Sequence, residues 1–212
     1  RYFKPRYGYS WDWCPRLVPS GLWGRLLLKT GASARVRIRE MHTAYDPSEN
    51  LGRVTVSLDG ASEVDQWHIR LLDGEEEIAR AEATKGVDSL SLPPTPVTAW
   101  WPNGFGEAKV YTVEIAASSQ GQAFLYETRK AGFRTIEWQA CEGAPEAAAP
   151  WICVVNGTPI FLQGVNWTPI RNNYQDVTES DYVQRIALYQ EMGCTLFRVW
   201  GGAMLEREFF YD

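Results

Sequence analysis

The feature that most constrains the fold is a series of about seven short runs in residues 35–138, many of which alternate apolar and polar residues. In the run 52–60, for example, Val54, Val56 and Leu58 are each separated by one polar residue. Side chains of a β-strand point alternately to opposite faces, so this period of two predicts strands with one buried face. The runs are 35–43, 52–60, 65–74, 76–85, 89–93, 109–118 and 124–138.

Seven short strands with turn signals between them predict one immunoglobulin-like, two-layer β-sandwich over 35–138, in a domain assigned to 33–138. Asp73-Gly74 lies between two of the runs and is a residue pair that tight hairpins prefer. We expect no helix within 52–83. The side chains expected to point inward are Val54, Val56, Trp67, Ile69, Val113 and Ile115.

The pattern changes after Trp138. Residues 139–150 are rich in Ala, Pro and Glu, which is typical of a linker. Residues 151–167 then predict a hairpin around Asn156-Gly157, with its second strand ending at Asn166 and Trp167.

A helix is expected next. Thr178 is a suitable N-cap, and Asp181 three residues later can complete a capping box. Gly193 is placed where a helix C-terminus favours glycine. The expected buried stripe is Tyr182, Ile186 and Tyr189. A buried strand, TLFRVWG, follows, with a second helix from about Leu205, so 151–212 predicts the opening of a parallel α/β array.

Residues 1–32 hold an aromatic-rich loop and one expected strand, Leu26 to Lys29. They are too few to bury a core alone and are interpreted as the end of a preceding β-domain. We therefore expect the chain to be an internal piece of a longer protein.

Composition excludes several classes of protein. There are 21 basic and 26 acidic residues, a net charge of -5, and no Lys/Arg run, which argues against a nucleic-acid partner. No apolar stretch approaches the roughly 18 residues of a membrane span. No bound cofactor is expected.

The cysteines, Cys14, Cys141, Cys153 and Cys194, are scattered, and only His42 and His68 could join them, so no metal site is expected. Four lone thiols fit a reducing, cytoplasmic location, with two disulfides in a periplasmic or secreted protein as the alternative. The chain also holds ten tryptophans, several beside Asp, Asn or Gly.

Several motifs, in this order along the chain, resemble glycoside hydrolase family 2 and most closely its β-mannosidase branch. They are WDWCPR (11–16), SGLW (20–23), WWPNGFGEAKVYTVEI (100–115), GFRTIE (132–137), NGTPIFLQGVNWTP (156–169) and FRVWGGAMLE (197–206). Cys14 stands where the branch usually has glycine, and the last motif reads Gly-Gly-Ala where Gly-Gly-Gly is common. These departures bear on sugar specificity more than on reaction class.

The resemblance implies the end of a jelly-roll sugar-binding domain (1–32), the whole immunoglobulin-like domain, and the truncated start of a (β/α)8 TIM barrel (151–212). In that family a pair of glutamates on the fourth and seventh barrel strands carries out catalysis with retention. Neither strand is expected in this chain, so no catalytic residue is assigned.

Four candidate substrate-binding residues come from the ends of the two expected barrel strands, where barrel active sites are built. They are Asn166, Trp167, Arg198 and Trp200. Packing beneath loops is the alternative for both tryptophans. For Arg198, a structural ion pair competes with orienting a catalytic carboxylate. By resemblance, Trp200 lines the pocket of the terminal sugar.

Asp12, between Trp11 and Trp13, is the fifth candidate. By resemblance its loop reaches the barrel mouth, where the carboxylate bonds hydroxyls of the terminal sugar; the alternative is a loop-capping aspartate. Glu206 is interpreted as an acidic residue early in its helix, where the helix dipole favours it.

The resemblance thus predicts a segment of an exo-acting β-mannosidase with a terminal β-mannoside as its carbohydrate partner. Alternatives within the family are a β-galactosidase, a β-glucuronidase or an exo-β-glucosaminidase. The alternative from another class is a non-catalytic carbohydrate-binding or scaffold module. The oligomeric state is unknown.

Overall fold

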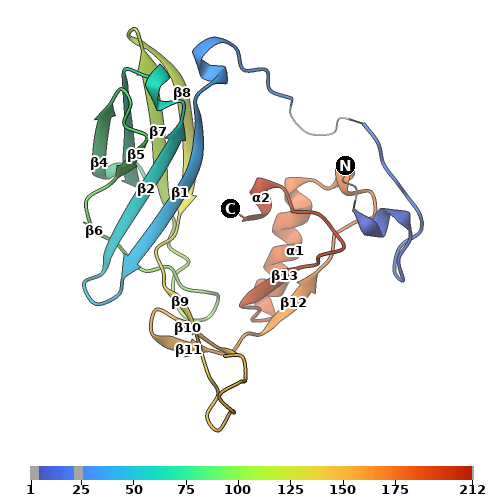
Figure 1. Ribbon diagram of the computed structural model, residues 1–212. Helices are drawn as coiled ribbons and strands as arrows, with labels where there is room; N and C mark the ends of the chain where they lie inside the picture. The colour runs from blue at the N-terminus through green and yellow to red at the C-terminus, as the bar shows by residue number, and fades with distance from the viewer. Residues whose placement is uncertain (1–4, 22–25, 212) are drawn as a thin grey trace. The chain divides into compact units, whose positions relative to one another are not determined.

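The computed structural model describes residues 5–21 and 26–211 (Figure 1). By its contacts the chain forms two compact units. We call Leu28–Phe161 the sheet unit, and Arg1–Leu27 together with Leu162–Asp212 the terminal unit. Each unit is described by itself.

The sheet unit contains two four-stranded antiparallel sheets. The first has the order β1-β2-β5, with β6 also paired to β2; its strands are β1 (Arg37–Asp46), β2 (Leu51–Asp59), β5 (Ser89–Ser91) and β6 (Thr95–Pro96). The second has the order β4-β3-β7-β8; its strands are β3 (Gln66–Asp73), β4 (Glu76–Thr84), β7 (Tyr111–Ser119) and β8 (Gln122–Ala131).

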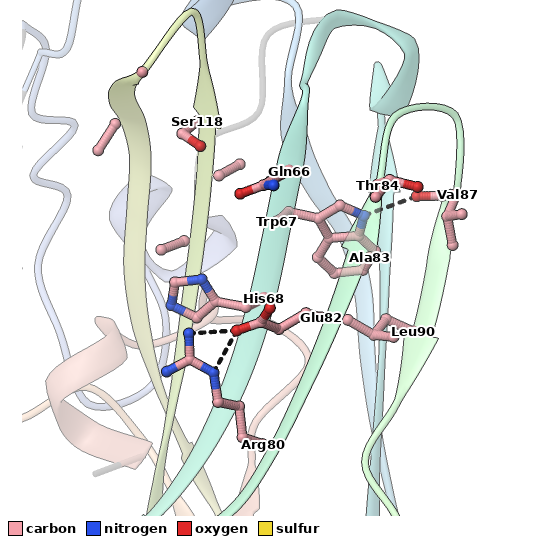
Figure 2. Close-up of a pocket in the computed structure, with 14 residues that line it drawn as sticks. Gln66, Trp67, His68, Arg80, Glu82, Ala83, Thr84, Val87, Leu90 and Ser118 are labelled. Carbon is pink, nitrogen blue, oxygen red and sulfur yellow. Dashed lines mark hydrogen bonds and ion pairs between the residues drawn. The ribbon is translucent and has the colours of Figure 1, made fainter.

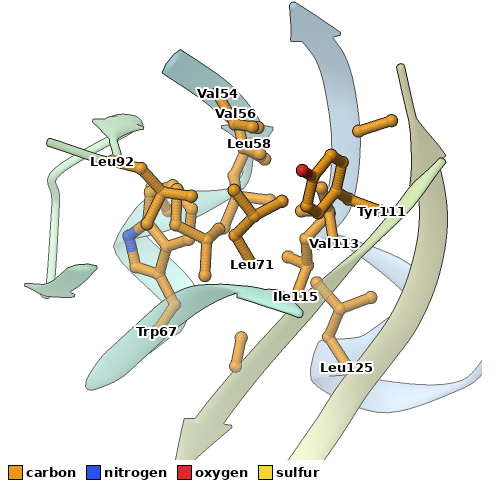
Figure 3. Close-up of a cluster of buried hydrophobic side chains, with 14 of the residues drawn as sticks. Val54, Val56, Leu58, Trp67, Leu71, Leu92, Tyr111, Val113, Ile115 and Leu125 are labelled. Carbon is orange, nitrogen blue, oxygen red and sulfur yellow. The ribbon is translucent and has the colours of Figure 1, made fainter. Parts of the chain in front are cut away.

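One apolar core is formed by side chains from both sheets (Figure 3). All six side chains expected to point inward belong to it, and none is more than 1% exposed. The buried indole of Trp67 also satisfies its polar atom, because Nε1 donates to the carbonyl oxygen of Val87 at 2.8 Å. The period-two prediction for the six residues is therefore confirmed.

Short turns connect the strands of this unit. β3 and β4 form the expected hairpin, in which Asp73 pairs with Glu76 and Gly74 has a φ of 61°. A three-residue 3-10 helix, η3 (Ala61–Glu63), follows β2, so the expectation of no helix in 52–83 is wrong for this turn. Another 3-10 helix, η2 (Gly31–Ala34), precedes β1.

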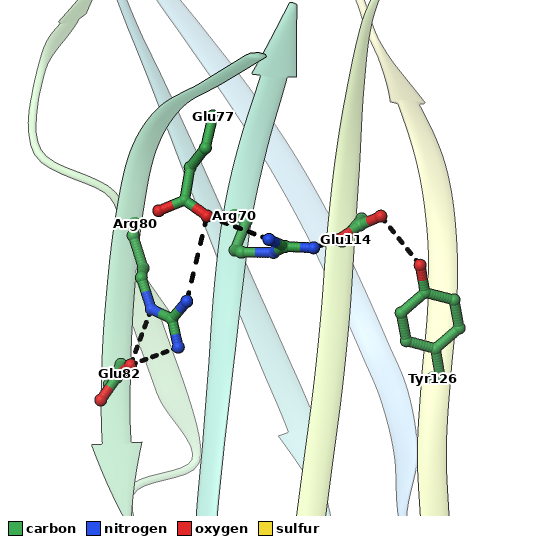
Figure 4. A network of polar contacts seen from close by, with 6 residues as sticks. All are labelled: Arg70, Glu77, Arg80, Glu82, Glu114 and Tyr126. Atoms are coloured by element: carbon green, nitrogen blue, oxygen red, sulfur yellow. Dashed lines mark hydrogen bonds and ion pairs between the residues drawn. The ribbon is translucent and has the colours of Figure 1, made fainter. Parts of the chain in front are cut away.

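The outward face of the second sheet carries a polar network (Figure 4). Arg70 on β3 donates to Glu77 on β4 and to Glu114 on β7, and Tyr126 on β8 donates to Glu114 at 2.8 Å. The bond from Tyr126, together with that from Arg70, lowers the pKa of the Glu114 carboxyl. Such cross-strand pairs link all four strands on the exposed face.

The run 124–138 was expected to be one strand, but it divides into β8 and β9 (Ile136–Gln139). β9 joins β10 (Ile152–Val155) and β11 (Thr158–Ile160) in an antiparallel sheet with the order β11-β10-β9. The linker predicted at 139–150 therefore connects two strands of one sheet. The domain boundaries drawn from the sequence stay predictions.

The hairpin between β10 and β11 turns at Asn156-Gly157, as expected, with φ of 49° and 80°. The side chain of Asn156 fixes this turn, because Oδ1 accepts from the Thr135 amide and Nδ2 donates to the Trp100 carbonyl. However, the second strand ends at Ile160 and not at Trp167. A separate strand, β12 (Gly164–Trp167), belongs to the terminal unit.

The terminal unit contains the expected β-α-β arrangement. β12 pairs in parallel with β13 (Leu196–Val199), and α1 (Glu179–Glu191) connects them. Thr178 and Asp181 form the predicted capping box, and Gly193 has the positive φ expected at a helix C-terminus. The predicted stripe on α1 packs on the strands. This unit also contains two short 3-10 helices, η1 (Arg6–Tyr9) and η4 (Tyr174–Asp176).

Near the ends of the chain one predicted element is wrong, and another is present with a later start. Residues 26–29 form no strand, and Leu26, Leu27 and Leu28 are 80%, 67% and 89% exposed. A strand needs a hydrogen-bonded neighbour, and this segment pairs with no described strand. The second helix, α2 (Glu208–Tyr211), begins three positions after the expected start at Leu205.

Candidate functional site

The motif WDWC forms a closed turn, which we call the tryptophan loop (Trp11–Cys14). The amide of Trp11 donates to the carbonyl of Cys14 at 3.2 Å, and the amide of Cys14 donates to the carbonyl of Trp11 at 3.1 Å. These two bonds place Asp12 and Trp13 at the tip. Asp12 is exposed, and its carboxylate has no hydrogen bond or ion pair to another described residue. It is therefore available to a ligand.

Beneath the tryptophan loop lies the turn after β13, which we call the glycine corner (Trp200–Ala203). The carbonyl of Gly202 accepts hydrogen bonds from the amides of Arg6 and Tyr7, at 3.0 and 3.4 Å. A Cβ atom on Gly202 would lie 2.3 Å from Cζ2 of Trp200, so only glycine lets this indole fold over the corner. A third hydrogen bond joins the N-terminal segment to the rest of the terminal unit, because the side-chain amide of Asn172 donates to the carbonyl of Pro15 at 2.9 Å.

Aromatic rings fill the space between the tryptophan loop and the glycine corner. The Trp200 ring lies 5.2 Å from that of Trp11 and 6.2 Å from that of Trp13, measured between centroids. Tyr7 stacks on Trp13 at 5.6 Å and also contacts Trp200 and Tyr174. We call these five rings the aromatic cluster. The structure thus brings the loop that carries Asp12 onto Trp200.

Asn166 and Arg198 lie side by side on the paired strands. They are register partners of β12 and β13, and Nη1 of Arg198 donates to Oδ1 of Asn166 at 2.6 Å. Both side chains are exposed. The described partner of Arg198 is thus an amide, and the alternative considered for Arg198, a structural ion pair, is not formed with a described carboxylate.

Trp167 points to the opposite face from Asn166 and is only 3% exposed. It packs against Tyr182 of α1 and against Phe197 and Phe210. Its Nε1 donates to Oε1 of Glu206 at 2.8 Å. Trp167 is therefore a packing residue, which is the alternative considered for it in the sequence.

Glu206 accepts a second hydrogen bond, from the hydroxyl of Tyr182. The residue precedes α2 by two positions, so its interpretation as an acidic residue inside the first helical turn is wrong. Burial, the hydrogen bond to Glu206 and the charge of that carboxylate raise the pKa of Tyr182 above its ordinary value. Glu206 thus ties the strand β12 to the helix α1 through two buried donors.

A hollow with a volume of about 690 Å³ lies elsewhere, at the second sheet of the sheet unit (Figure 2). Alanines, including Ala116 and Ala123, form part of its lining. Its Arg80 and Glu82 already bond each other, at 2.7 Å from Nε. Size alone therefore does not make this hollow the functional site.

No group of three or more metal-ligating side chains occurs in the part of the chain that the structure describes. Within the same ranges, no helix is long and apolar enough to cross a membrane. None of the four cysteines forms a disulfide. The chemistry of the candidate site is that of one free carboxylate among half-exposed indoles. Indole faces stack on the apolar faces of sugars, and carboxylates accept from hydroxyls.

Sequence reasoning missed three members of this arrangement: Tyr7, Asn172 and the acceptor role of Glu206. Tyr7 lies in a four-residue 3-10 helix, which is too short to show a periodicity, and Asn172 lies in an irregular segment. No local pattern therefore distinguishes them from ordinary loop residues. A helix-period pattern did identify Tyr182 as buried, but nothing local gives its partner.

Comparison with solved structures first gives the class of fold. A β-D-mannosidase from Dictyoglomus thermophilum superposes with a TM-score of 0.75 over 98% of this chain and 26% of that chain, at 22% identity. β-Glucuronidase 3 of Bacteroides uniformis superposes with a TM-score of 0.62 over 83% of this chain and 21% of that chain, at 15% identity. The fold is therefore one that segments of glycosidases adopt.

Comparison with curated protein sequences gives relatives with a more specific name than glycosidase. The chain is 26% identical over 217 residues to β-mannosidase B of Aspergillus oryzae, which covers 99% of this chain and 25% of that protein. No family model matches the chain. Together the matches support a segment like those of the β-mannosidases in glycoside hydrolase family 2. The chain spans about a quarter of the length of the relatives it matches.

Proposed function

We propose that the chain is a segment of a retaining exo-glycoside hydrolase that removes terminal β-linked mannose from β-mannosides. In this proposal the two four-stranded sheets are the immunoglobulin-like domain, and β12-α1-β13 opens a TIM barrel. The catalytic glutamates lie outside this chain. The similarity to β-mannosidases over nearly the whole chain supports the assignment.

The contact of the tryptophan loop with Trp200 is the observation that carries the proposal. Trp11 and Trp13, which flank Asp12 in the sequence, both lie against Trp200, the residue that directly follows β13. The C-terminal ends of parallel strands are where barrel active sites form. Asp12 would accept from hydroxyls of the terminal sugar while Trp200 stacks on its ring.

Asn166 and Arg198 complete the proposed site from the strands. Their exposed face is the one opposite to α1, which in a barrel is the face turned toward the axis. The guanidinium, held by the Asn166 amide, would be placed to orient a carboxylate supplied from another barrel strand. Trp167, on the covered face, supports the site from beneath and does not contact the sugar.

The charge of Asp12 helps to separate the proposal from the glucuronidase alternative. A uronic acid carries its own carboxylate, which a free aspartate at the sugar site would repel. A mannoside is neutral and presents only hydroxyl groups. The indole-flanked aspartate therefore favours a neutral sugar. A β-galactosidase, an exo-β-glucosaminidase and a non-catalytic carbohydrate-binding module remain as outcomes of the experiment.

The test uses the full-length protein and an aryl β-mannoside. Asp12→Ala should lower kcat/KM by roughly one to two powers of ten, because a hydrogen bond to a charged group contributes about 1.5–3 kcal/mol. Glu191→Ala, which removes an exposed carboxylate of the same unit, is the control and should leave kcat/KM unchanged. A change of less than about twofold for Asp12→Ala would refute its role.

Two further measurements complete the experiment. The 212-residue chain alone should not hydrolyse the aryl β-mannoside, since the proposed glutamates lie elsewhere. Aryl β-galactosides, β-glucuronides and β-glucosaminides, assayed with the full-length protein, separate the alternatives. Faster turnover of any of them than of the mannoside would replace the proposed substrate, and no turnover of any would favour a binding module.

A further inference from the structure

Tyr7 is the one fully buried ring of the aromatic cluster. Its side chain is 0% exposed, whereas Trp11 and Trp13 are each 44% exposed. Its ring lies 5.6 Å from Trp13, 6.3 Å from Tyr174 and 6.4 Å from Trp200. The half-exposed ring of Trp13 therefore stacks on a ring that a ligand could not reach.

The backbone of Tyr7 also forms hydrogen bonds to both the tryptophan loop and the glycine corner. Its amide donates to the carbonyl of Gly202 in the glycine corner, and its own carbonyl accepts from Sγ of Cys14 at 3.2 Å. The same carbonyl accepts from the amide of Ser10. Main chain and ring together connect the tryptophan loop, the glycine corner and η4, three segments far apart in sequence.

The hydroxyl of Tyr7 contributes no described bond. Its oxygen is buried and has no hydrogen-bond partner among the described residues. Burial, followed by the neighbouring Tyr174 and Glu206, raises the pKa of this phenol above its ordinary value, so it stays neutral. Since a buried hydroxyl without a partner does not stabilise a fold, the ring itself must be the useful part of the side chain.

We propose that Tyr7 is a positioning residue for the sugar site, whose buried ring sets the distance between the tryptophan loop and Trp200 and so places Asp12. The inference rests on the proposed function for the identity of the ligand, but not for the arrangement of the rings. Removing the ring would leave Trp13 and Trp200, which also contact each other, without the buried surface against which both pack. The position of the tryptophan loop relative to the glycine corner would then no longer be fixed.

The test of the arrangement uses the 212-residue chain and needs no sugar. Hydrogen exchange, measured by mass spectrometry, follows the amide of Ala203, which donates to the Trp200 carbonyl, and the amides of the tryptophan loop. Tyr7→Ala should accelerate this exchange at least tenfold. Tyr7→Phe, which keeps the ring, should leave it unchanged or slower. The near-ultraviolet circular dichroism of the coupled indoles should fall for Tyr7→Ala and persist for Tyr7→Phe.

Tyr9→Ala is the matched control, because Tyr9 lies in the same 3-10 helix but is 52% exposed. It should resemble the unmodified chain in both measurements. Exchange in helix α1, which belongs to the same terminal unit as Tyr7, reports whether Tyr7→Ala still folds. If that variant does not fold, Gly202→Ala provides the second perturbation, since its Cβ displaces the Trp200 ring; Gly201→Ala, with nothing within 4 Å of its Cβ, is the control.

The functional readout is the KM of the full-length protein for the aryl β-mannoside. Tyr7→Ala should raise KM by about fivefold or more with a smaller change in kcat, and Tyr7→Phe should restore KM. Unchanged exchange, dichroism and KM in Tyr7→Ala would overturn the proposal, as would equal effects of Tyr7→Phe and Tyr7→Ala. Failure of the full-length protein to hydrolyse any β-mannoside would instead overturn the proposed function, while exchange would still decide the role of Tyr7.

Discussion

Replacing Glu206 tests whether this carboxylate holds the terminal unit together. Its two donors, Trp167 Nε1 and the Tyr182 hydroxyl, belong to side chains only 3% and 4% exposed. Glu206→Ala leaves both donors without an acceptor, and each buried unsatisfied group costs about 1–3 kcal/mol. Glu206 is half-buried, so water can relieve part of this. We expect a destabilisation of about 2–3 kcal/mol.

Glu206→Gln should cost only about 1 kcal/mol, because the amide oxygen can accept from Trp167 while the amide nitrogen donates to the Tyr182 oxygen. Glu208→Ala, which removes an exposed acid two positions later, is the control and should change stability by less than about 0.5 kcal/mol.

The assay is urea-dependent hydrogen exchange of peptides from β12 and α1, because two units need not unfold as one and a single global transition would mix them. A double-mutant cycle with Tyr182→Phe should give a coupling of about 0.5–3 kcal/mol. Equal stability of Glu206→Ala and Glu208→Ala, or a coupling near zero, would refute the reasoning.

The parts of the fold that the sequence predicted are those determined by neighbouring residues. Alternation in β2, β3 and β7 reports directly which side chains face the core, since the period of a strand is local. The same holds for the capping box of Thr178 and Asp181 and for the turn at Asn156-Gly157. Each of these features is complete within a few residues.

The errors arise where a segment depends on a distant partner. Residues 26–29 have a strand composition but no described strand to pair with. Gly164 begins a new strand because Leu196, far along the chain, supplies its parallel neighbour. A prediction from the sequence alone extends the strand before it, β11, through Gly164. Nothing in the neighbouring residues shows that the strand partner changes from β10 to β13.

In the candidate site, too, some residues could be found from the sequence and others only from the folded structure. Asp12 and Trp200 stand out because each occurs in a motif of unusual composition, and the structure places Trp200 against the tryptophans that flank Asp12. The residues that hold them, Tyr7 and Glu206, are an ordinary aromatic and an ordinary acid in the sequence. Their roles exist only in the contacts of the folded unit, so no pattern of neighbouring residues could reveal them.

Two predictions concern stability. Thr178→Ala should destabilise α1 by about 1 kcal/mol, because the capping hydroxyl accepts from the Asp181 amide, and Thr178→Ser should restore it; exchange of the α1 amides measures both. The last concerns His68 on β3, whose pKa is lowered below its ordinary value of 6.5, first by burial and then by the charge of Arg80. The charged groups around it are Arg80, Glu77 and Glu82 on β4, Arg70 on β3 and Glu114 on β7. Because the surroundings of His68 in the folded chain disfavour the charged imidazole, lowering the pH through 6.5 and below adds a proton to the unfolded chain before the folded one. The stabilisation is therefore complete above that value and is lost as the pH falls. His68→Gln should remove this part of the acid dependence, so the sheet unit of the variant should lose less stability than the unmodified chain between about pH 7.5 and about pH 5.5 in urea unfolding. Parallel curves for the two proteins, or a steeper loss in the variant, would show that the imidazole is not held neutral by its surroundings.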